Sequence, residues 1–198
     1  LNYFATNDDL SIEFSTEIYE DLSKENNKYE YIYPNFSINK DLDINNIDGA
    51  LSFETSGFHK NYNSNVYEAL IINDLLYNSP TSFSNNGFEN NYNFLIKNVN
   101  SNSTNSSKYK KNENYEILSN FEFKSALPLI KKDKNYSNYL TPILSYRYGL
   151  GKSKNLINDD RRIDVKNIFA FDRIGAKETI ESGQSLTFGT EFSKLNNN

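Results

Sequence analysis

Strict alternation of apolar and polar residues is the feature of this 198-residue chain that most limits its fold. Residues 10–15 read Leu-Ser-Ile-Glu-Phe-Ser, and the same period of two recurs in residues 115–124 and 185–192. Because successive side chains of a strand point to opposite faces, this spacing gives each strand one apolar and one polar face. Patterns with the helical period are nearly absent, and only residues 66–76 are ambiguous. The alternation is typical of antiparallel sheets.

The alternating stretches predict nine strands, separated by polar turns rich in Asn, Ser, Asp, Lys and Gly. The predicted strands cover residues 9–20, 28–39, 48–59, 65–77, 88–99, 114–128, 138–149, 162–173 and 181–193. The longest predicted connection, residues 100–114, is almost wholly Asn, Ser, Lys and Tyr. No Pro- or Gly-rich linker interrupts the chain, so residues 1–198 are interpreted as a segment of one domain.

Three prolines fall in or at the ends of the predicted strands: Pro34, Pro128 and Pro142. Proline has no N–H to donate to a sheet ladder, so each one predicts a bulge, a strand end or a sheet edge. A bulge that bends a large sheet is the simplest interpretation.

Strand length leaves two kinds of all-β protein open. Strands of soluble sandwiches are commonly about five or six residues long, whereas a tilted transmembrane strand needs about 9 to 11. The predicted strands are long, and their second faces are too polar for a second core. A soluble sheet with solvated outer faces has the same pattern, so a membrane barrel and a soluble β-domain fit the alternation equally well.

Charge and composition exclude several function classes. Lys and Arg number 21 against 26 Asp and Glu, giving a net charge of -5, whereas nucleic-acid binding requires clustered cations. The absence of cysteine excludes disulfides and thiolate metal sites. The longest apolar run, residues 69–72, is far short of the roughly 20 residues of a membrane helix.

No motif predicts catalysis, a metal or a cofactor. His59 is the only histidine, so neither a histidine-rich metal site nor a Ser-His-Asp triad can be assembled without it. Residues 41–46 begin like a calcium loop, but Asn46 and Ser52 stand where that loop needs Gly and Glu. The acidic pair at 159–160 adjoins Arg161 and Arg162, an arrangement more typical of a solvated salt-bridge cluster than of an acid–base pair.

From Tyr139 onward the sequence contains a series of short motifs. They are Leu-Thr-Pro-Ile-Leu-Ser-Tyr-Arg-Tyr at 140–148, Asn-Leu at 155–156, Asp-Asp-Arg-Arg at 159–162, Asn-Ile-Phe at 167–169, Asp-Arg-Ile at 172–174, Ile-Glu-Ser-Gly at 180–183 and Leu-Thr-Phe-Gly at 186–189. Their order resembles the lipopolysaccharide-assembly outer-membrane protein family (LptD, formerly the organic-solvent-tolerance protein). The family often has Asp-Arg where this chain has Glu178 and Thr179. Upstream of Tyr139 the resemblance is limited mainly to the general pattern of the strands.

The resemblance implies structural positions and transfers no catalytic residue. The positions are Pro142, Asp160, Arg161, Arg162, Asn167, Phe169, Asp172, Arg173, Glu181, Gly183 and Gly189.

The resemblance also implies a cellular location and a function. The family's proteins have a periplasmic domain followed by a very large barrel in the outer membrane of Gram-negative bacteria. Lipopolysaccharide passes through a lateral seam of that barrel into the outer leaflet, a lipoprotein plugs its interior, and a periplasmic bridge protein delivers the lipid to the N-terminal domain. This chain would be an interior stretch of the barrel, an open, strongly curved meander of about nine strands with two unpaired edges. The open alternatives are a porin-like or adhesin-like barrel and a soluble module that binds glycans through exposed tyrosines.

If the strands cross a bilayer, alternation predicts which side chains face lipid. The predicted lipid-facing residues are Leu10, Ile12, Phe14, Ile117, Phe121, Phe123, Leu186 and Phe188. Long loops of such barrels are extracellular. We therefore expect four connections outside the cell, at residues 20–28, 60–65, 100–114 and 149–161.

Overall fold

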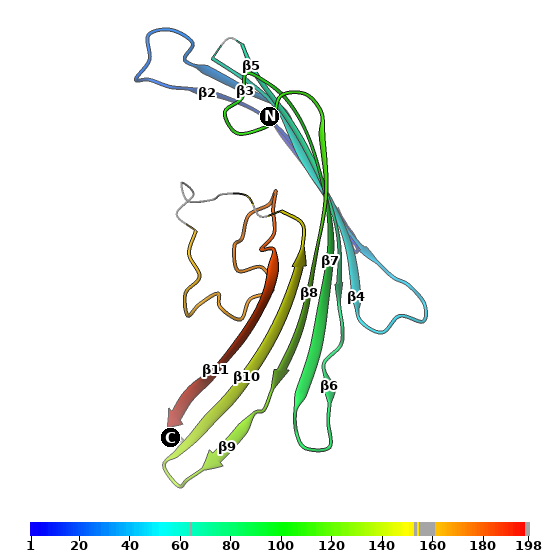
Figure 1. Ribbon diagram of the computed structural model, residues 1–198, viewed down its shortest axis with the longest axis vertical. Coiled ribbons are helices and arrows are strands. Elements are labelled where there is room, and N and C mark those ends of the chain that lie inside the picture. The colour runs from blue at the N-terminus through cyan, green and yellow to red at the C-terminus, as the bar shows by residue number, and fades with distance from the viewer. Residues whose placement is uncertain (64, 153, 155–160, 197–198) are drawn as a thin grey trace. The chain divides into compact units, whose positions relative to one another are not determined.

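A computed structural model describes residues 1–63, 65–152, 154 and 161–196 of the chain. The strands within them form one sheet whose order follows the sequence (Figure 1). The strands are β1 (Asn2–Asn7), β2 (Leu10–Glu20), β3 (Tyr29–Leu42), β4 (Ala50–Tyr62), β5 (Val66–Asn78), β6 (Ser82–Phe83), β7 (Glu89–Thr104), β8 (Asn114–Ala126), β9 (Leu129–Lys132), β10 (Tyr136–Leu150) and β11 (Gly183–Asn196). The short strands β6 and β9 pair beside the main path, with β7 and β10. The prediction of an all-β antiparallel meander is confirmed.

The sheet is not closed into a barrel. The strand path begins at β1 and ends at β11, and in the described part of the chain these two strands pair with β2 and β10 alone. Two open edges are therefore present, as expected.

The prediction of a strand at residues 162–173 is wrong. In the structure residues 165–169 form turns and no ladder passes through them. The Oδ1 atom of Asp164 accepts the backbone N–H groups of Lys166 and Asn167, and Asp172 does the same for Ile174 and Gly175. Short acidic side chains that bond to the backbone two residues on compete with a strand, and here they override the alternation.

The lengths of the connections also differ from the prediction. Strand β7 runs on to Thr104, so the Asn- and Ser-rich connection shrinks to residues 105–113. The longest connection is residues 151–182, between β10 and β11. The ambiguous segment near residues 66–76 is strand β5.

The chain divides into two compact units. The first comprises Leu1–Asn46, Ala50–Leu76 and Ile96–Leu118, and the second comprises Ile47–Gly49, Tyr77–Leu95 and Ser119–Asn198. Four apolar side chains are buried within the strands of the first unit: Leu70, Ile72, Val99 and Leu118. In the second unit the buried apolar residues are Ile143, Ala176 and Ile180, of which the last two belong to the long connection.

Pro34 lies at a bulge of β3, and a bulge is one of the three positions predicted for this proline. The pairing partners shift between Ile32 and Asn35 on both sides of β3, which has one more residue there than β2 or β4. The extra residue changes the parity of β3, so Tyr31 and Phe36 both pair with residues of one face of β2, Ile18 and Phe14. The bulge thus keeps aromatic residues on one face along the strand.

Pro142 lies where β10 changes its partner. Leu140 pairs with Leu129 of β9, whereas Ile143 pairs with Ala126 of β8. Between them the carbonyl of Pro142 accepts the N–H of Leu127, and the missing N–H of proline falls in the gap between the two ladders. Pro128 occupies the same gap, between the end of β8 and the start of β9.

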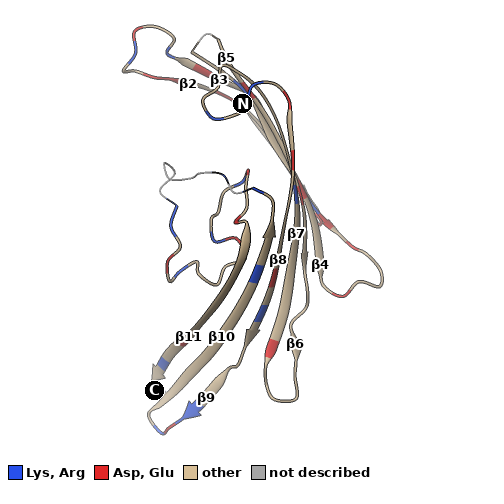
Figure 2. Ribbon diagram, viewed as in Figure 1, with Lys and Arg blue, Asp and Glu red and all other residues tan. Residues whose placement is uncertain are grey.

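The strands of the second unit have one apolar and one polar face. On one face Tyr146 pairs with Phe123 of β8 and with Leu186 of β11. On the other face Arg147 pairs with Glu122 and with Ser185. Figure 2 shows that charged residues are sparse on β8, β10 and β11. Leu186 and Phe188 are 70% and 73% exposed, so no protein layer covers the apolar face there.

The first unit has the same two-faced strands. The rings of Phe14 and Phe36 stack with centroids 6.0 Å apart, from adjacent strands. Three of its connections, between β2 and β3, β4 and β5, and β7 and β8, lie at the same end of the strands because the meander alternates direction. They include three of the four expected outer loops, and the side of a membrane on which they lie stays a prediction.

Candidate functional site: a covered polar face

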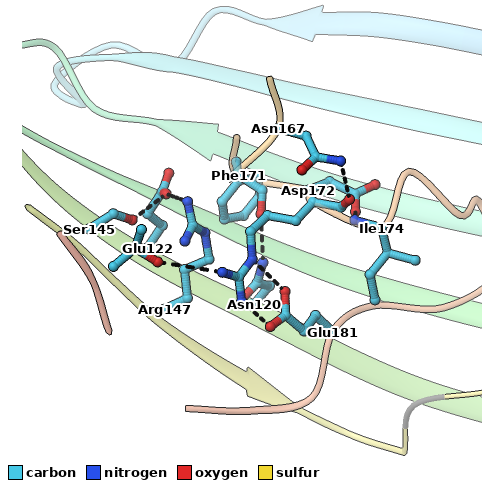
Figure 3. A network of polar contacts seen from close by, with 11 residues as sticks. Asn120, Glu122, Ser145, Arg147, Asn167, Phe171, Asp172, Ile174 and Glu181 are labelled. Atoms are coloured by element: carbon cyan, nitrogen blue, oxygen red, sulfur yellow. Dashed lines mark hydrogen bonds and ion pairs between the residues drawn. The ribbon is translucent and has the colours of Figure 1, made fainter. Parts of the chain in front are cut away.

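A buried ion pair lies on the polar face of the second unit. Nη2 of Arg147 in β10 lies 2.7 Å from Oε1 of Glu122 in β8, and both side chains are almost wholly inaccessible to solvent. The hydroxyl of Ser145 donates to Oε1 of Glu122 at 2.8 Å (Figure 3). The amide of Asn93 donates to the other oxygen, Oε2, at 3.0 Å. The carboxylate is thus held from β7 and β10, the strands on either side of β8, which limits the cost of burying its charge.

The end of the long connection covers this face. We call residues 161–182 the covering segment, and in Figure 1 it folds back beside β10 and β11. The amide of Asn120 in β8 donates to the carbonyl of Phe171, at 3.3 Å. Thr179 and Ile180 of the segment are 1% and 4% exposed, so this end of the segment is packed, whereas residues 161–166 are exposed.

Arg173 joins two parts of the covering segment and also contacts the last strand. Arg173 donates from Nε and Nη2 to the two oxygens of Glu181, and from Nη1 to the hydroxyl of Thr187 in β11. A two-pronged arginine–carboxylate contact fixes orientation as well as distance. It therefore ties the middle of the segment both to its own end and to the last strand.

Two glycines make room for the covering segment. A Cβ atom on Gly189 of β11 would lie 2.8 Å from the ring of Phe169, and one on Gly149 of β10 would collide with the carbonyl oxygen of Glu181. A larger residue at Gly149 would displace the backbone of the segment, and one at Gly189 would force the Phe169 ring to move. Close approach of the segment to the sheet thus depends on these two glycines.

Polar contacts within the covering segment hold its shape. The side-chain amide of Asn167 donates to the carbonyls of Arg162 and Arg173, at 2.8 and 3.2 Å. Nη1 of Arg161 donates to the carbonyls of Ile174, at 3.0 Å, and Gly175. These bridges fold the segment into compact turns without helix or strand.

A cavity of about 330 Å³ opens at the covering segment, and we call it the basic pocket. Among the described residues, four cationic side chains, one carboxylate and two isoleucines line it: Lys154, Arg161, Arg162, Arg173, Glu181, Ile163 and Ile174. Figure 2 shows Lys and Arg along this connection.

The structure brings most of the residues marked by the family resemblance into this one site. Asn167, Phe169, Asp172, Arg173 and Glu181 make the contacts that shape the covering segment or seat it on the strands. Arg161 and Arg162 line the basic pocket, and Gly189 lies under Phe169. Gly183 begins β11 with a φ of 92°, and Pro142 lies at the partner change of β10. Asp160 lies outside the described residues.

The residues predicted to face lipid share one face of their strands. Ile117, Phe123, Leu186, Phe188 and Phe14 are exposed. Leu10, Ile12 and Phe121 are partly exposed, and Ile12 pairs with Ile38 while Phe121 pairs with Tyr148. That this face meets lipid stays a prediction.

Sequence reasoning missed the partners of the buried charges. Glu122 was expected on the polar face, but its pairing with Arg147 and the burial of Ser145 and Thr187 were not anticipated. The sequence does show two opposite charges, Glu122 and Arg147, each between two aromatic residues of a long predicted strand. Without the register between the two strands, however, this pattern does not show that the two charges are neighbours.

The arrangement places a packed cover over a buried ion pair on the polar face, and no assembled catalytic group occurs among the described residues. In the same residues no cluster of three or more acidic or histidine side chains is placed to hold a metal ion. No helix in the described part of the chain is long and apolar enough to cross a membrane. Comparison with models of known protein families finds no match to this chain, and comparison with curated proteins finds none either.

Proposed function

We propose that the chain forms part of the wall of an outer-membrane β-barrel that moves lipopolysaccharide to the outer leaflet. The observation that carries the proposal is the contrast between the two faces of the sheet. One face exposes aligned Phe, Tyr, Leu and Ile side chains, and the other buries paired charges beneath a folded connection. An exposed apolar face that spans several strands needs an apolar neighbour, and lipid is such a neighbour for long strands.

Transport in this proposal depends on geometry rather than on catalysis. The polar face lines the interior, where charged sugar and phosphate groups can move in contact with water. The apolar face holds the wall in the hydrocarbon layer, where a closed barrel satisfies every backbone hydrogen bond. The proposed partners are lipopolysaccharide, a plug lipoprotein inside the barrel and a periplasmic bridge protein that acts through a separate N-terminal domain.

Lipopolysaccharide is proposed as the cargo because of the motifs from Tyr139 onward. Support comes from the place of these motifs in the fold: Arg173, Glu181 and Phe169 help to seat the covering segment on the polar face. A family signature is expected to consist of positions that serve one structural role together, and these motif positions do so. A porin-like or adhesin-like barrel accounts for the two faces but gives no reason for this cluster.

One observation favours a soluble glycan-binding module as a second candidate. A cavity of about 170 Å³ in the first unit is lined by three tyrosines, Tyr19, Tyr29 and Tyr62, together with charged residues. Aromatic rings beside carboxylates and amides are a common way to hold a sugar. Tyr29 is also contacted by the ammonium group of Lys28, 5.2 Å from the ring centroid.

Two experiments separate the candidates. The first extracts the full-length protein from cells with salt, alkali or detergent, and release by salt or alkali alone would favour the soluble module. The second depletes the full-length protein and measures lipopolysaccharide on the cell surface by labelling intact cells. We expect detergent-dependent extraction and loss of surface lipopolysaccharide on depletion. Detergent-dependent extraction with unchanged surface lipopolysaccharide would favour the porin-like or adhesin-like barrel.

A further inference from the structure

The apolar face of the second unit ends in a row of cations near the β9–β10 turn. The last apolar row across β9, β10 and β11 contains three exposed neighbours, Leu129, Leu140 and Phe192. The next row, two residues nearer that end of the strands, contains Lys131, Asn138 and Lys194. Side chains two residues apart on a strand point to the same face, so both lysines border the apolar face directly. We call Lys131 and Lys194 the lysine row.

Lys194 reaches toward the strand ends. Its Nζ atom lies 3.8 Å from the centroid of the Tyr136 ring, and Tyr136 belongs to the following row of the same face. Lysine and tyrosine at a membrane boundary lay their apolar parts along the hydrocarbon and place their polar ends in the headgroup layer. The pair of Lys194 and Tyr136 beside Phe192 has this arrangement.

Positive charge exceeds negative charge around the lysine row. Residues 129–140 and 190–196 contain four lysines, at positions 131, 132, 134 and 194, and two carboxylates, Asp133 and Glu191. Glu191 pairs with Thr141 and lies on the opposite face. In the described part of the chain no ion pair joins either member of the lysine row to a carboxylate. Figure 2 shows basic residues on β9 and near the end of β11.

The corresponding row at the other end of the same face is uncharged. There Tyr148 of β10 pairs with Phe121 of β8 and with Gln184 of β11. The lysines therefore distinguish one boundary of the apolar face from the other, which the alternation of apolar and polar residues does not do.

We propose that the lysine row binds the headgroup phosphate of an anionic phospholipid whose acyl chains lie against the neighbouring apolar row. Ammonium groups near a membrane surface attract anionic headgroups. The exposed side chains of Leu129, Leu140 and Phe192 provide the contact for the acyl chains. Charge and apolar surface thus complement the two parts of one lipid molecule.

Phospholipid is the expected occupant because of the end of the sheet at which the lysines lie. The β9–β10 turn comprises residues 133–135, whereas the connection at the other end of β10 comprises residues 151–182. Short turns of outer-membrane barrels face the periplasm, and the leaflet on that side consists of phospholipid rather than lipopolysaccharide. This choice rests on the membrane wall of the proposed function and not on its cargo.

The test measures which lipids the full-length protein retains. Native mass spectrometry is carried out on protein in detergent with equimolar phosphatidylglycerol, which is anionic, and phosphatidylethanolamine, which has no net charge. We expect phosphatidylglycerol to be enriched on the protein. Lys131→Gln and Lys194→Gln should each lower the affinity for phosphatidylglycerol by about fivefold, the effect of one lysine near an anionic surface. Binding of phosphatidylethanolamine should stay unchanged.

Lys132→Gln is the matched control. It removes the same charge from the adjacent residue, but Lys132 pairs with Ser137 and lies on the opposite face. The control should bind both lipids like the unchanged protein, and Lys131→Arg, which keeps the charge, should do so as well. An equal loss in Lys132→Gln and Lys131→Gln would show a general charge effect and overturn the site.

A further probe distinguishes the sources of the phosphate. Lipopolysaccharide is added to the same mixture, and its binding should be equal in the unchanged protein and in Lys131→Gln. A loss of lipopolysaccharide binding in Lys131→Gln, with displacement of phosphatidylglycerol, would overturn the choice of phospholipid. No enrichment of phosphatidylglycerol on the unchanged protein would overturn the proposal as a whole.

The lipid site and the transport function can fail separately. Unchanged surface lipopolysaccharide on depletion would contradict transport and leave the lysine row as a lipid site of another barrel. Lipid binding that does not depend on Lys131 or Lys194 would overturn the site and leave transport standing.

Discussion

Two buried cations inside the strands lie next to carboxylates of a neighbouring strand. Lys97 of β7 lies 2.5 Å from Asp74 of β5, and Arg147 of β10 lies 2.7 Å from Glu122 of β8. In each pair the cation is nearly inaccessible to solvent. Removing one partner of such a pair leaves a buried charge uncompensated, which costs more than the pair itself contributes.

Glu122→Gln should therefore destabilise the protein strongly. We expect the free energy of unfolding to fall by about 3 to 5 kcal/mol, the usual result of breaking a buried pair. The double variant Glu122→Gln/Arg147→Gln removes both charges and should recover a clear part of that loss. Denaturant unfolding of the full-length protein in detergent measures both. A double variant that is no more stable than Glu122→Gln would contradict the account of the pair.

The connection between β2 and β3 contains an acidic residue with a perturbed pKa. The hydroxyl and then the backbone N–H of Ser23 donate to Asp21, and Lys24 lies 3.1 Å away, so the pKa of Asp21 falls from 3.8 to about 2. Because the pKa is lowered in the folded turn, these contacts stabilise the turn above pH 3.8, and the effect is lost as the pH falls through about 2.

Ser23→Ala should raise the pKa of Asp21 toward 3.8, because the largest cause of the shift is the serine hydroxyl. Carbon-detected NMR of the Asp21 carboxyl measures the titration. Ser84→Ala, a change in a different connection, is the control and should leave it unchanged. An unshifted titration in Ser23→Ala would show that the hydroxyl contact is absent in solution.

At the scale of the strands, two kinds of local rule decide the structure. Alternation assigns the faces of β8, β10 and β11, because the Cβ direction depends on the strand alone. The bulge at Pro34 interrupts this counting, yet the extra residue keeps Tyr31 and Phe36 on one face. In the covering segment the turn-forming side chains Asp164 and Asp172 prevail over an alternating pattern.

The face assignment can be tested by two adjacent residues of β8. Ile117 is 75% exposed on the apolar face, and Glu116 lies on the opposite face. If the apolar face meets hydrocarbon, Ile117→Arg should destabilise the barrel, by up to the roughly 2 to 4 kcal/mol of a midplane position, and lower the amount of protein in the membrane, while Glu116→Arg should leave that amount near normal. Immunoblotting of membrane fractions measures the outcome.

Asn120 would be an unsuitable control although alternation also places it on the polar face. It is 5% exposed and bonded to the carbonyl of Phe171, so an arginine there would displace the covering segment. Equal tolerance of arginine at 116 and 117 would favour a soluble sheet.

At the scale of the whole molecule, the edge strands β1 and β11 each pair with one strand in the described part of the chain, so their outer sides carry unpaired backbone groups. An exposed edge invites pairing with other chains, and the hydrocarbon layer of a membrane does not tolerate one. A barrel wall therefore requires that β1 and β11 pair with further strands in the full-length protein.

Hydrogen exchange tests this requirement. In the full-length protein in detergent, the amides of β1 and β11 should exchange as slowly as those of β8 and β10, which have neighbours on both sides. The amides of the β2–β3 connection provide a fast-exchanging reference. Fast exchange along the outer side of β11 would show that its edge stays open, which a membrane-spanning wall does not allow.

The sequence by itself determined the all-β class, the meander of long strands and the face on which Phe121, Phe123 and Leu186 lie. These features depend on side-chain direction and on turn residues, which act over a few positions of the chain. The tertiary structure alone decided that Glu122 pairs with Arg147, that β10 changes partner at Pro142 and that residues 161–182 return to cover the polar face. Each of these depends on the register between strands or on contacts across a long connection, such as Phe169 over Gly189, and local periodicity carries no information about either.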